Sequence, residues 1–160
     1  VVLVDNDSYM SGCYIHCVGL GLEIQGSINT IINTHFATNW DFLPDGSGLV
    51  SHGTGGGVWS RAGATNNRLI GVYMDYSTLV VDDPDHFEFV DGYFLLGAGW
   101  LPTEQSFISL RPTAAETGVT GLRITGNQIE VSGAMPRWLT VNTTALGKPG
   151  LPRCHSCFLF

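Results

Sequence analysis

Apolar residues recur along the chain in a six-residue pattern: apolar, any residue, turn former, any two residues, apolar. The pattern occurs five times, at residues 10–15, 31–36, 69–74, 89–94 and 124–129. Its third position is always glycine, asparagine or aspartate, namely Gly12, Asn33, Gly71, Asp91 and Gly126. These residue types favour bends and left-handed backbone, so each copy predicts two short strands joined by a tight bend.

A second apolar stretch follows each copy, so each repeat is expected to contain about three short strands. The copies start 21, 38, 20 and 35 residues apart. The short steps match one coil of a β-solenoid, and the long steps match a coil that carries an inserted loop. No stretch has a period of 3.6 residues, so we expect little helix. An antiparallel sandwich with irregular hairpins is the alternative fold.

Alternation of side chains along a strand predicts which residues face the core. The inward ladder is expected to contain Ile15, Phe36, Met74, Phe94 and Ile129. One outward column is then expected to contain Tyr14, His35, Tyr73, Tyr93 and Gln128. The column beside it is expected to contain His16, Ala37, Asp75, Leu95 and Glu130. The first outward column therefore consists almost entirely of ring-bearing side chains.

Composition and charge narrow the function classes. Hydrophobic residues make up 44% of the chain, charged residues only 13%, and there are 21 glycines, which favours β structure rich in turns. Asp and Glu number 14 against 7 Lys and Arg, for a net charge of −7, which argues against a nucleic-acid partner. No apolar run is long enough to cross a bilayer, so we expect no membrane partner. The glycine-rich stretch 53–57 lacks the lysine of a P-loop, and we expect no cofactor.

Segments such as 121–129 and 21–24 resemble coils of right-handed parallel β-helix proteins of the pectate-lyase-like superfamily, phage tailspikes and tail-fibre depolymerases in particular. The resemblance implies an all-β, right-handed parallel β-helix of about five coils with inserted loops. We expect the coils at residues 1–145, as a fragment lacking N-terminal coils, and a cap or connector at 146–160. It also implies a homo-oligomer, in particular a trimer, that binds surface polysaccharide and resides in a virion or outside the cell. No catalytic motif of the superfamily is found.

The ring column is the first candidate site. Neighbouring strands lie about 4.8 Å apart, so its rings are spaced to lie along an extended sugar chain. The alternative is that the rings pack under an inserted loop or against a neighbouring subunit. Asp75 and Glu130 are two coil steps apart, near 10 Å, which suggests an acid and a base around a water molecule, as in an inverting glycosidase. Trp40, Trp59 and Trp100 accompany the inserted loops and either present an apolar face to sugar or cap the core.

Two further clusters contain residue types that bind metals, but no metal site is predicted. The cysteines, Cys13, Cys17, Cys154 and Cys157, are interpreted chiefly as buried thiols, with a zinc site or a disulfide as alternatives. The acidic run Asp82, Asp83, Asp85, Glu88 and Asp91 is interpreted as solvated turn residues, with calcium as the alternative.

The leading functional hypothesis is a phage tailspike-like β-helix that binds bacterial surface polysaccharide. Hydrolytic or eliminative cleavage of that polysaccharide is left open by the residues. The alternative, from another functional class, is a non-catalytic structural or adhesive β-solenoid in a virion or extracellular fibre, whose outer columns mediate assembly.

Overall fold

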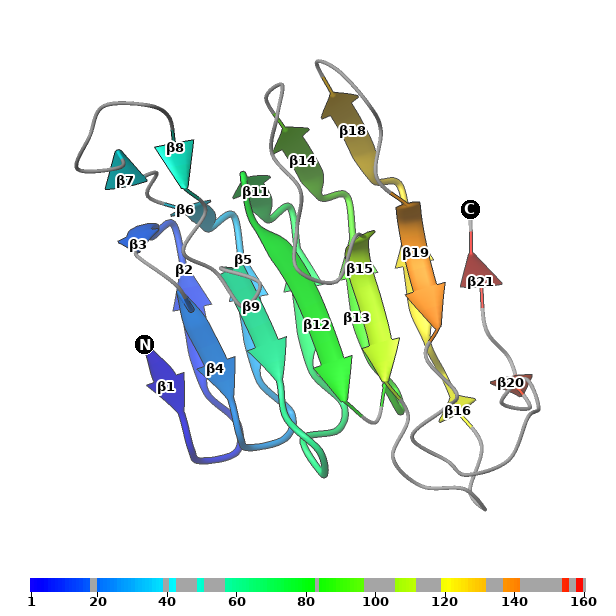
Figure 1. Cartoon of the computed structure of the whole chain (residues 1–160). Coiled ribbons are helices and arrows are strands. Elements are labelled where there is room, and N and C mark those ends of the chain that lie inside the picture. Colours follow the sequence, from blue (N-terminus) through cyan, green and yellow to red (C-terminus); the bar gives the residue numbers. More distant parts are fainter. Residues whose placement is uncertain are drawn as a thin grey trace.

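The chain folds into a parallel β-helix, as the repeat pattern predicts (Figure 1). The computed structural model describes residues 1–17, 20–38, 41–42, 49–50, 57–82, 84–96, 106–111, 119–131, 137–141, 154–155 and 158–159. These residues form strands, turns and extended segments and contain no helix. Accordingly, no helix among them is long and apolar enough to span a membrane.

Three long sheets, in which every pair of neighbouring strands is parallel, run along the molecule. Sheet A contains β1 (Val2–Leu3), β4 (Leu22–Ile24), β9 (Gly57–Ser60), β12 (Thr78–Asp82), β15 (Ser106–Arg111) and β19 (Arg137–Val141). Sheet B contains β2 (Tyr9–Ser11), β5 (Thr30–Ile32), β10 (Arg68–Ile70), β13 (Glu88–Val90), β17 (Arg123–Thr125) and β21 (Phe158–Leu159). Sheet C contains β3 (Tyr14–Cys17), β6 (His35–Thr38), β11 (Tyr73–Asp75), β14 (Tyr93–Leu96) and β18 (Gln128–Val131).

Each coil visits sheets A, B and C in turn. The five coils are β1-β2-β3, β4-β5-β6, β9-β10-β11, β12-β13-β14 and β15-β17-β18, and β19 and β21 extend sheets A and B beyond the fifth. Two small sheets complete the described strands: β16 (Val119–Thr120) pairs in parallel with β20 (Cys154–His155), and β7 (Asp41–Phe42) pairs in antiparallel fashion with β8 (Leu49–Val50). Since the long sheets are parallel throughout, the antiparallel sandwich is excluded.

The inserted segments occupy equivalent points of two coils. Residues 39–56 connect β6 to β9, and residues 97–105 connect β14 to β15, so both lead from sheet C to sheet A. This arrangement confirms that the long repeat steps are coils with insertions. The sheet C and sheet A strands on either side keep the register of the neighbouring coils.

The turn formers of the repeat stack at one bend between sheets B and C, as predicted. All five have positive φ: Gly12 (62°), Asn33 (47°), Gly71 (62°), Asp91 (52°) and Gly126 (69°). The backbone N–H of each of the first four donates to a carbonyl of the next coil, as Gly71 does to Val90 at 2.9 Å. A Cβ at Gly71 would lie 2.5 Å from Oδ1 of Asn33. The column therefore alternates glycine with asparagine or aspartate, because the side chain of one coil occupies the space beside the next position.

A second left-handed column was not predicted. It lies between sheets A and B and contains Asp7 (φ 60°), Ile28 (63°), Asn66 (58°), His86 (50°) and Gly121 (64°). Each member precedes its counterpart in the first column by five residues, so a three-residue strand of sheet B lies between two left-handed residues in every coil. Ile28 is a β-branched residue in a region that such residues rarely occupy.

Inward side chains from the three sheets form one continuous core. The predicted inward ladder is confirmed by the pairing of Ile15, Phe36, Met74, Phe94 and Ile129 across the coils of sheet C. The rings of Phe89, Phe94 and Phe107 link the three sheets, with centroids 5.3 and 5.1 Å apart. Two fully buried amides, Asn29 and Asn67, are hydrogen-bonded to each other at 3.0 Å and to backbone groups.

Candidate functional site

The outward face of sheet C carries the predicted ring column. Strand pairing aligns Tyr14, His35, Tyr73, Tyr93 and Gln128 in successive coils. Neighbouring ring centroids lie 4.7 Å apart for Tyr14 and His35, 4.2 Å for His35 and Tyr73, and 4.9 Å for Tyr73 and Tyr93. The first contact is edge-to-face, and the others are tilted, so the rings support one another. Tyr14 is 64% exposed at one end of the column.

The second outward column also forms in the predicted register, and it places Asp75 beside the rings. His35 Nε2 lies 3.8 Å from Asp75 Oδ2, with side-chain exposures of 26% and 24%. That separation exceeds a hydrogen bond, and both His35 Nε2 and Asp75 Oδ1 are buried with no hydrogen-bond partner among the described residues. Burial raises the pKa of Asp75, although the nearby His35 and His16 act to lower it. Burial lowers the pKa of His35, although the nearby Asp75 acts to raise it. Burial, with Asp75 and Glu130 nearby, also raises the pKa of Tyr73.

Glu130 belongs to the same second column, two coils away from Asp75. Its Oε2 accepts a hydrogen bond from the hydroxyl of Tyr93. This bond, with burial and the Glu130 charge, raises the pKa of Tyr93 to about 12. The phenol therefore remains protonated at physiological pH and acts as a donor to the carboxylate. Sheet C thus holds one carboxyl with a raised pKa and one carboxylate bound to a ring of the column.

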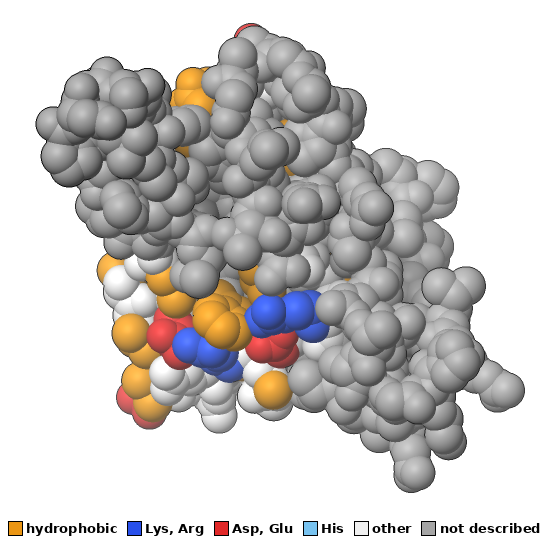
Figure 2. Space-filling view, in the orientation of Figure 1, with side chains coloured by type: hydrophobic (Ala, Val, Ile, Leu, Met, Phe, Trp, Pro, Cys, Tyr) orange, Lys and Arg blue, Asp and Glu red, His pale blue; other side chains and the backbone are white. Residues whose placement is uncertain are grey.

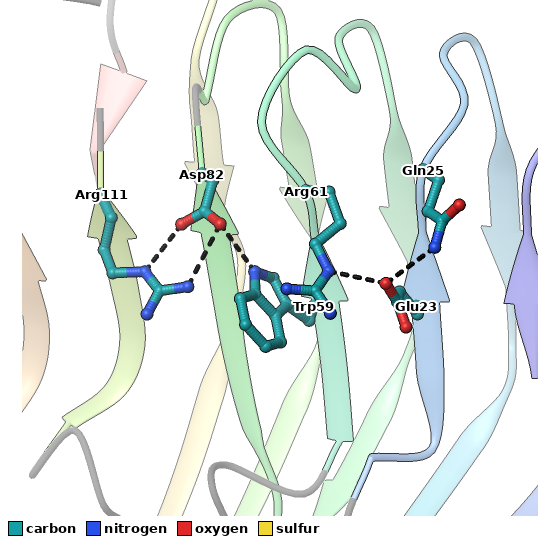
Figure 3. A network of polar contacts seen from close by, with 6 residues as sticks. All are labelled: Glu23, Gln25, Trp59, Arg61, Asp82 and Arg111. Atoms are coloured by element: carbon teal, nitrogen blue, oxygen red, sulfur yellow. Dashed lines mark hydrogen bonds and ion pairs between the residues drawn. The ribbon is translucent and has the colours of Figure 1, made fainter. Parts of the chain in front are cut away.

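A polar network covers the outward face of sheet A, and it contains Trp59 (Figure 3). Trp59 Nε1 donates to Asp82 Oδ2 at 2.8 Å, and the guanidinium carbon of Arg61 lies 3.3 Å from the indole centroid. Arg111 Nε donates to Asp82 Oδ1 at 2.7 Å, and Arg61 Nε donates to Glu23 Oε1 at 2.7 Å. The Arg61 hydrogen bond, helped by Gln25, lowers the pKa of Glu23.

The network places charges of opposite sign side by side on this face. Figure 2 shows basic and acidic side chains alternating around apolar surface where the face is described. Arg61 covers the indole, and Asp82 binds its N–H, so Trp59 is held within the sheet A surface and lies outside the ring column. The alternation Val58-Trp59-Ser60-Arg61 is the sequence signal that predicts a strand there and two outward side chains.

Cys13 corrects the prediction of a buried thiol, because it is free and exposed. The equivalent residues of inner coils, Thr34 and Val72, are buried. Among the described residues, Cys13 lies in the first coil, whereas Thr34 and Val72 each lie between two coils. The side chains of Cys17, Cys154 and Cys157 lie outside the described part of the structure, as do Trp40 and Trp100.

The acidic run is distributed over several surfaces. Asp82 lies on sheet A with Arg111, Glu88 on sheet B with Arg68, and Asp85 in the intervening turn beside His86. Asp91 is a left-handed residue of the bend, and Asp83 lies outside the described residues. Within the ranges that the structure describes, no group of three or more His, Cys, Asp or Glu side chains is arranged to hold a metal ion.

The chain is similar to a polygalacturonase. It is 27% identical over 133 residues to Polygalacturonase QRT3 of Arabidopsis thaliana, across 82% of this chain and 23% of that protein. The chain therefore spans about a quarter of the length of the polygalacturonase that it matches. No protein-family model and no solved structure matches the chain.

Proposed function

We propose that this chain binds a polysaccharide along the ring column of sheet C. The observation that carries the proposal is the uninterrupted contact of Tyr14, His35, Tyr73 and Tyr93 across four coils. Aromatic rings with hydroxyl groups bind sugars through their apolar surfaces and through hydrogen bonds. The similarity to a polygalacturonase, whose name denotes a polysaccharide substrate, supports the same ligand class.

The test compares two tyrosines of the first coil that are almost equally exposed. Tyr14 lies in the ring column at 64% exposure, and Tyr9 lies on sheet B at 67% exposure. We expect Tyr14→Ala and Tyr73→Ala to weaken binding to a polysaccharide on a glycan panel by about tenfold, on the scale of one aromatic contact. Tyr9→Ala is expected to leave binding unchanged. Equal binding by all three variants, or no binding to any glycan on the panel, would refute the proposal.

Cleavage of the bound polysaccharide is a second element of the proposal. Asp75, whose pKa is raised by burial, keeps its proton more readily and is suited to act as the general acid, while Glu130 is suited to act as the general base. Their separation of two coil steps, about 10 Å between strands, approaches that of inverting glycosidases. Asp75→Asn and Glu130→Gln should each lower turnover by about 10²-fold or more. Wild-type turnover in either variant would exclude that residue.

The resemblance to phage tailspikes extends the proposal to the whole protein. It predicts a bacterial surface polysaccharide as the ligand, a trimeric assembly and a location in a virion or outside the cell. Sedimentation of the chain will show whether a trimer forms.

A non-catalytic structural solenoid is the competing function, because rings that pack on one another stabilise a sheet without a ligand. That function predicts that Tyr73→Ala lowers thermal stability or oligomeric state and leaves glycan binding unchanged. The two readouts, melting temperature and glycan affinity, therefore separate the two functions.

A further inference from the structure

The arginines of the described chain are sorted by sheet. Arg61 and Arg111 lie on sheet A, with Arg137 at the start of another of its strands, and Arg68 and Arg123 lie on sheet B. The five strands of sheet C contain neither arginine nor lysine. The outward faces of the β-helix therefore differ in charge, although they are built from the same repeat.

Among the described residues, the carboxyl groups have arginine partners on sheets A and B but not on sheet C. On sheets A and B, Glu23, Asp82 and Glu88 each lie within 3.0 Å of an arginine nitrogen. On sheet C, Asp75 faces His35 at 3.8 Å, and Glu130 accepts from the uncharged hydroxyl of Tyr93. Sheet C therefore has two carboxyl groups beside a column of rings, and its strands contain neither arginine nor lysine.

We propose that the ring column selects a polysaccharide that carries amino groups, so that its ligand is a cationic glycan. An ammonium group is attracted both to carboxylates and to aromatic ring faces, and sheet C offers both in adjacent columns. A uronic-acid chain would instead place its carboxylates beside Glu130, with no arginine or lysine on the sheet C strands to bind them. This inference rests on the proposed polysaccharide-binding function and names the class of its ligand.

Three oligosaccharides of matched length test the selection: a glucosamine oligomer, its fully N-acetylated counterpart and an oligogalacturonate. Affinities are measured by calorimetry at a mildly acidic pH, at which the amino groups of the glucosamine oligomer are protonated, at low and at high salt. We expect the glucosamine oligomer to bind most tightly and its affinity to fall as salt is added, because salt screens exposed charges. Tyr14→Ala should weaken that binding, which assigns it to the ring column.

A pair of charge-removing variants gives the matched control. Glu130→Gln removes one negative charge from sheet C and retains an acceptor for Tyr93, whereas Glu88→Gln removes one from sheet B. Glu130→Gln should weaken the glucosamine oligomer about two- to fivefold, the scale of a surface ion pair. Glu88→Gln should leave its affinity unchanged.

The outcomes separate this inference from the broader function. One contrary result is that the N-acetylated oligomer or oligogalacturonate binds as tightly as the glucosamine oligomer or more tightly, with Tyr14→Ala weakening that binding. This result would overturn the selection for cationic glycans and uphold polysaccharide binding by the ring column. An equal effect of Glu88→Gln and Glu130→Gln would also overturn it, since the charge of sheet C would then have no special role. If none of the three oligosaccharides binds but another glycan on the panel does, and Tyr14→Ala weakens that binding, then the selection for cationic glycans is wrong and polysaccharide binding is upheld.

Discussion

Ile28 shows how the stacking of coils imposes a backbone conformation on a residue that disfavours it. Its φ of 63° places a β-branched side chain in the left-handed region, and half of that side chain (52%) is exposed. Its N–H donates to the carbonyl of Thr65 in the next coil at 3.0 Å, so stacking holds this geometry. The residue therefore contributes strain at a position where three of its four column neighbours are Asp, Asn and Gly.

Replacing Ile28 with asparagine should stabilise the chain. Asparagine tolerates the left-handed region, so Ile28→Asn is expected to raise the free energy of unfolding by about 1 kcal/mol. Urea denaturation measures the change. The control, Ile32→Asn, lies in strand β5 of the same coil and should destabilise the chain. A loss of stability in Ile28→Asn would show that the apolar contacts of Ile28 outweigh its strain.

Asp75 makes stability depend on pH in a defined direction. Its folded-state pKa is raised above the ordinary value of 3.8, chiefly by burial, so the unfolded state loses its proton first as the pH rises. The stability contributed by the protonated carboxyl is complete below that ordinary value and is lost as the pH rises through the folded-state pKa. Asp75→Asn removes this titration. As the pH rises from 3.8 through the folded-state pKa of Asp75, the free energy of unfolding of Asp75→Asn should therefore increase relative to that of the wild type. A difference that does not change with pH would contradict the burial of Asp75.

At the scale of the element, the bend between sheets B and C combines backbone conformation with close stacking. Gly12 and Gly71 have the same φ of 62°, but a Cβ at Gly12 would meet nothing within 4 Å, while one at Gly71 would approach Asn33. The two positions therefore separate the cost of a left-handed alanine from the cost of a steric clash.

Alanine substitution at these two bends should have unequal effects. Gly12→Ala is expected to lower the free energy of unfolding by about 1 kcal/mol, and Gly71→Ala by distinctly more. Asn33→Gly should restore most of the difference when combined with Gly71→Ala, because it removes the clashing amide. Equal losses at both glycines, measured by denaturation, would mean that the bend relaxes without cost.

Strand β14 tests the packing of one element against the core. Phe94 is fully buried between Phe89 and Phe107, whereas its neighbour Leu95 points outward and is half-buried. Phe94→Ala should cost about 3–5 kcal/mol of unfolding free energy. Leu95→Ala is expected to cost clearly less, and the reverse order would place the strand in the opposite register.

At the scale of the whole molecule, each coil contacts only its neighbours, so stability is expected to vary along the β-helix. In this 160-residue chain the first coil exposes Val1, Val2, Val4, Tyr9 and Tyr14, while the inward residues Phe36, Met74 and Phe94 of the inner coils are fully buried. This difference predicts where the chain opens first.

Hydrogen exchange measured by mass spectrometry should reveal that gradient. In the 160-residue chain, peptides covering β10 and β11 should exchange at least tenfold more slowly than those covering β2 and β3, because opening the outermost coil of this chain breaks fewer contacts. Uniform protection along the chain would instead show that the coils unfold as one cooperative unit.

Local patterns in the amino-acid sequence determined the coils, the inward ladder, the ring column and the first left-handed bend. Period-two alternation and a glycine, asparagine or aspartate at a bend act over a few residues, so they can be read without knowing the neighbours. Only the tertiary structure decided which distant groups meet. Trp59 and Asp82 are 23 residues apart and are joined by coil stacking. The same stacking holds Ile28 in a left-handed conformation, through the hydrogen bond from its N–H to Thr65 of the next coil.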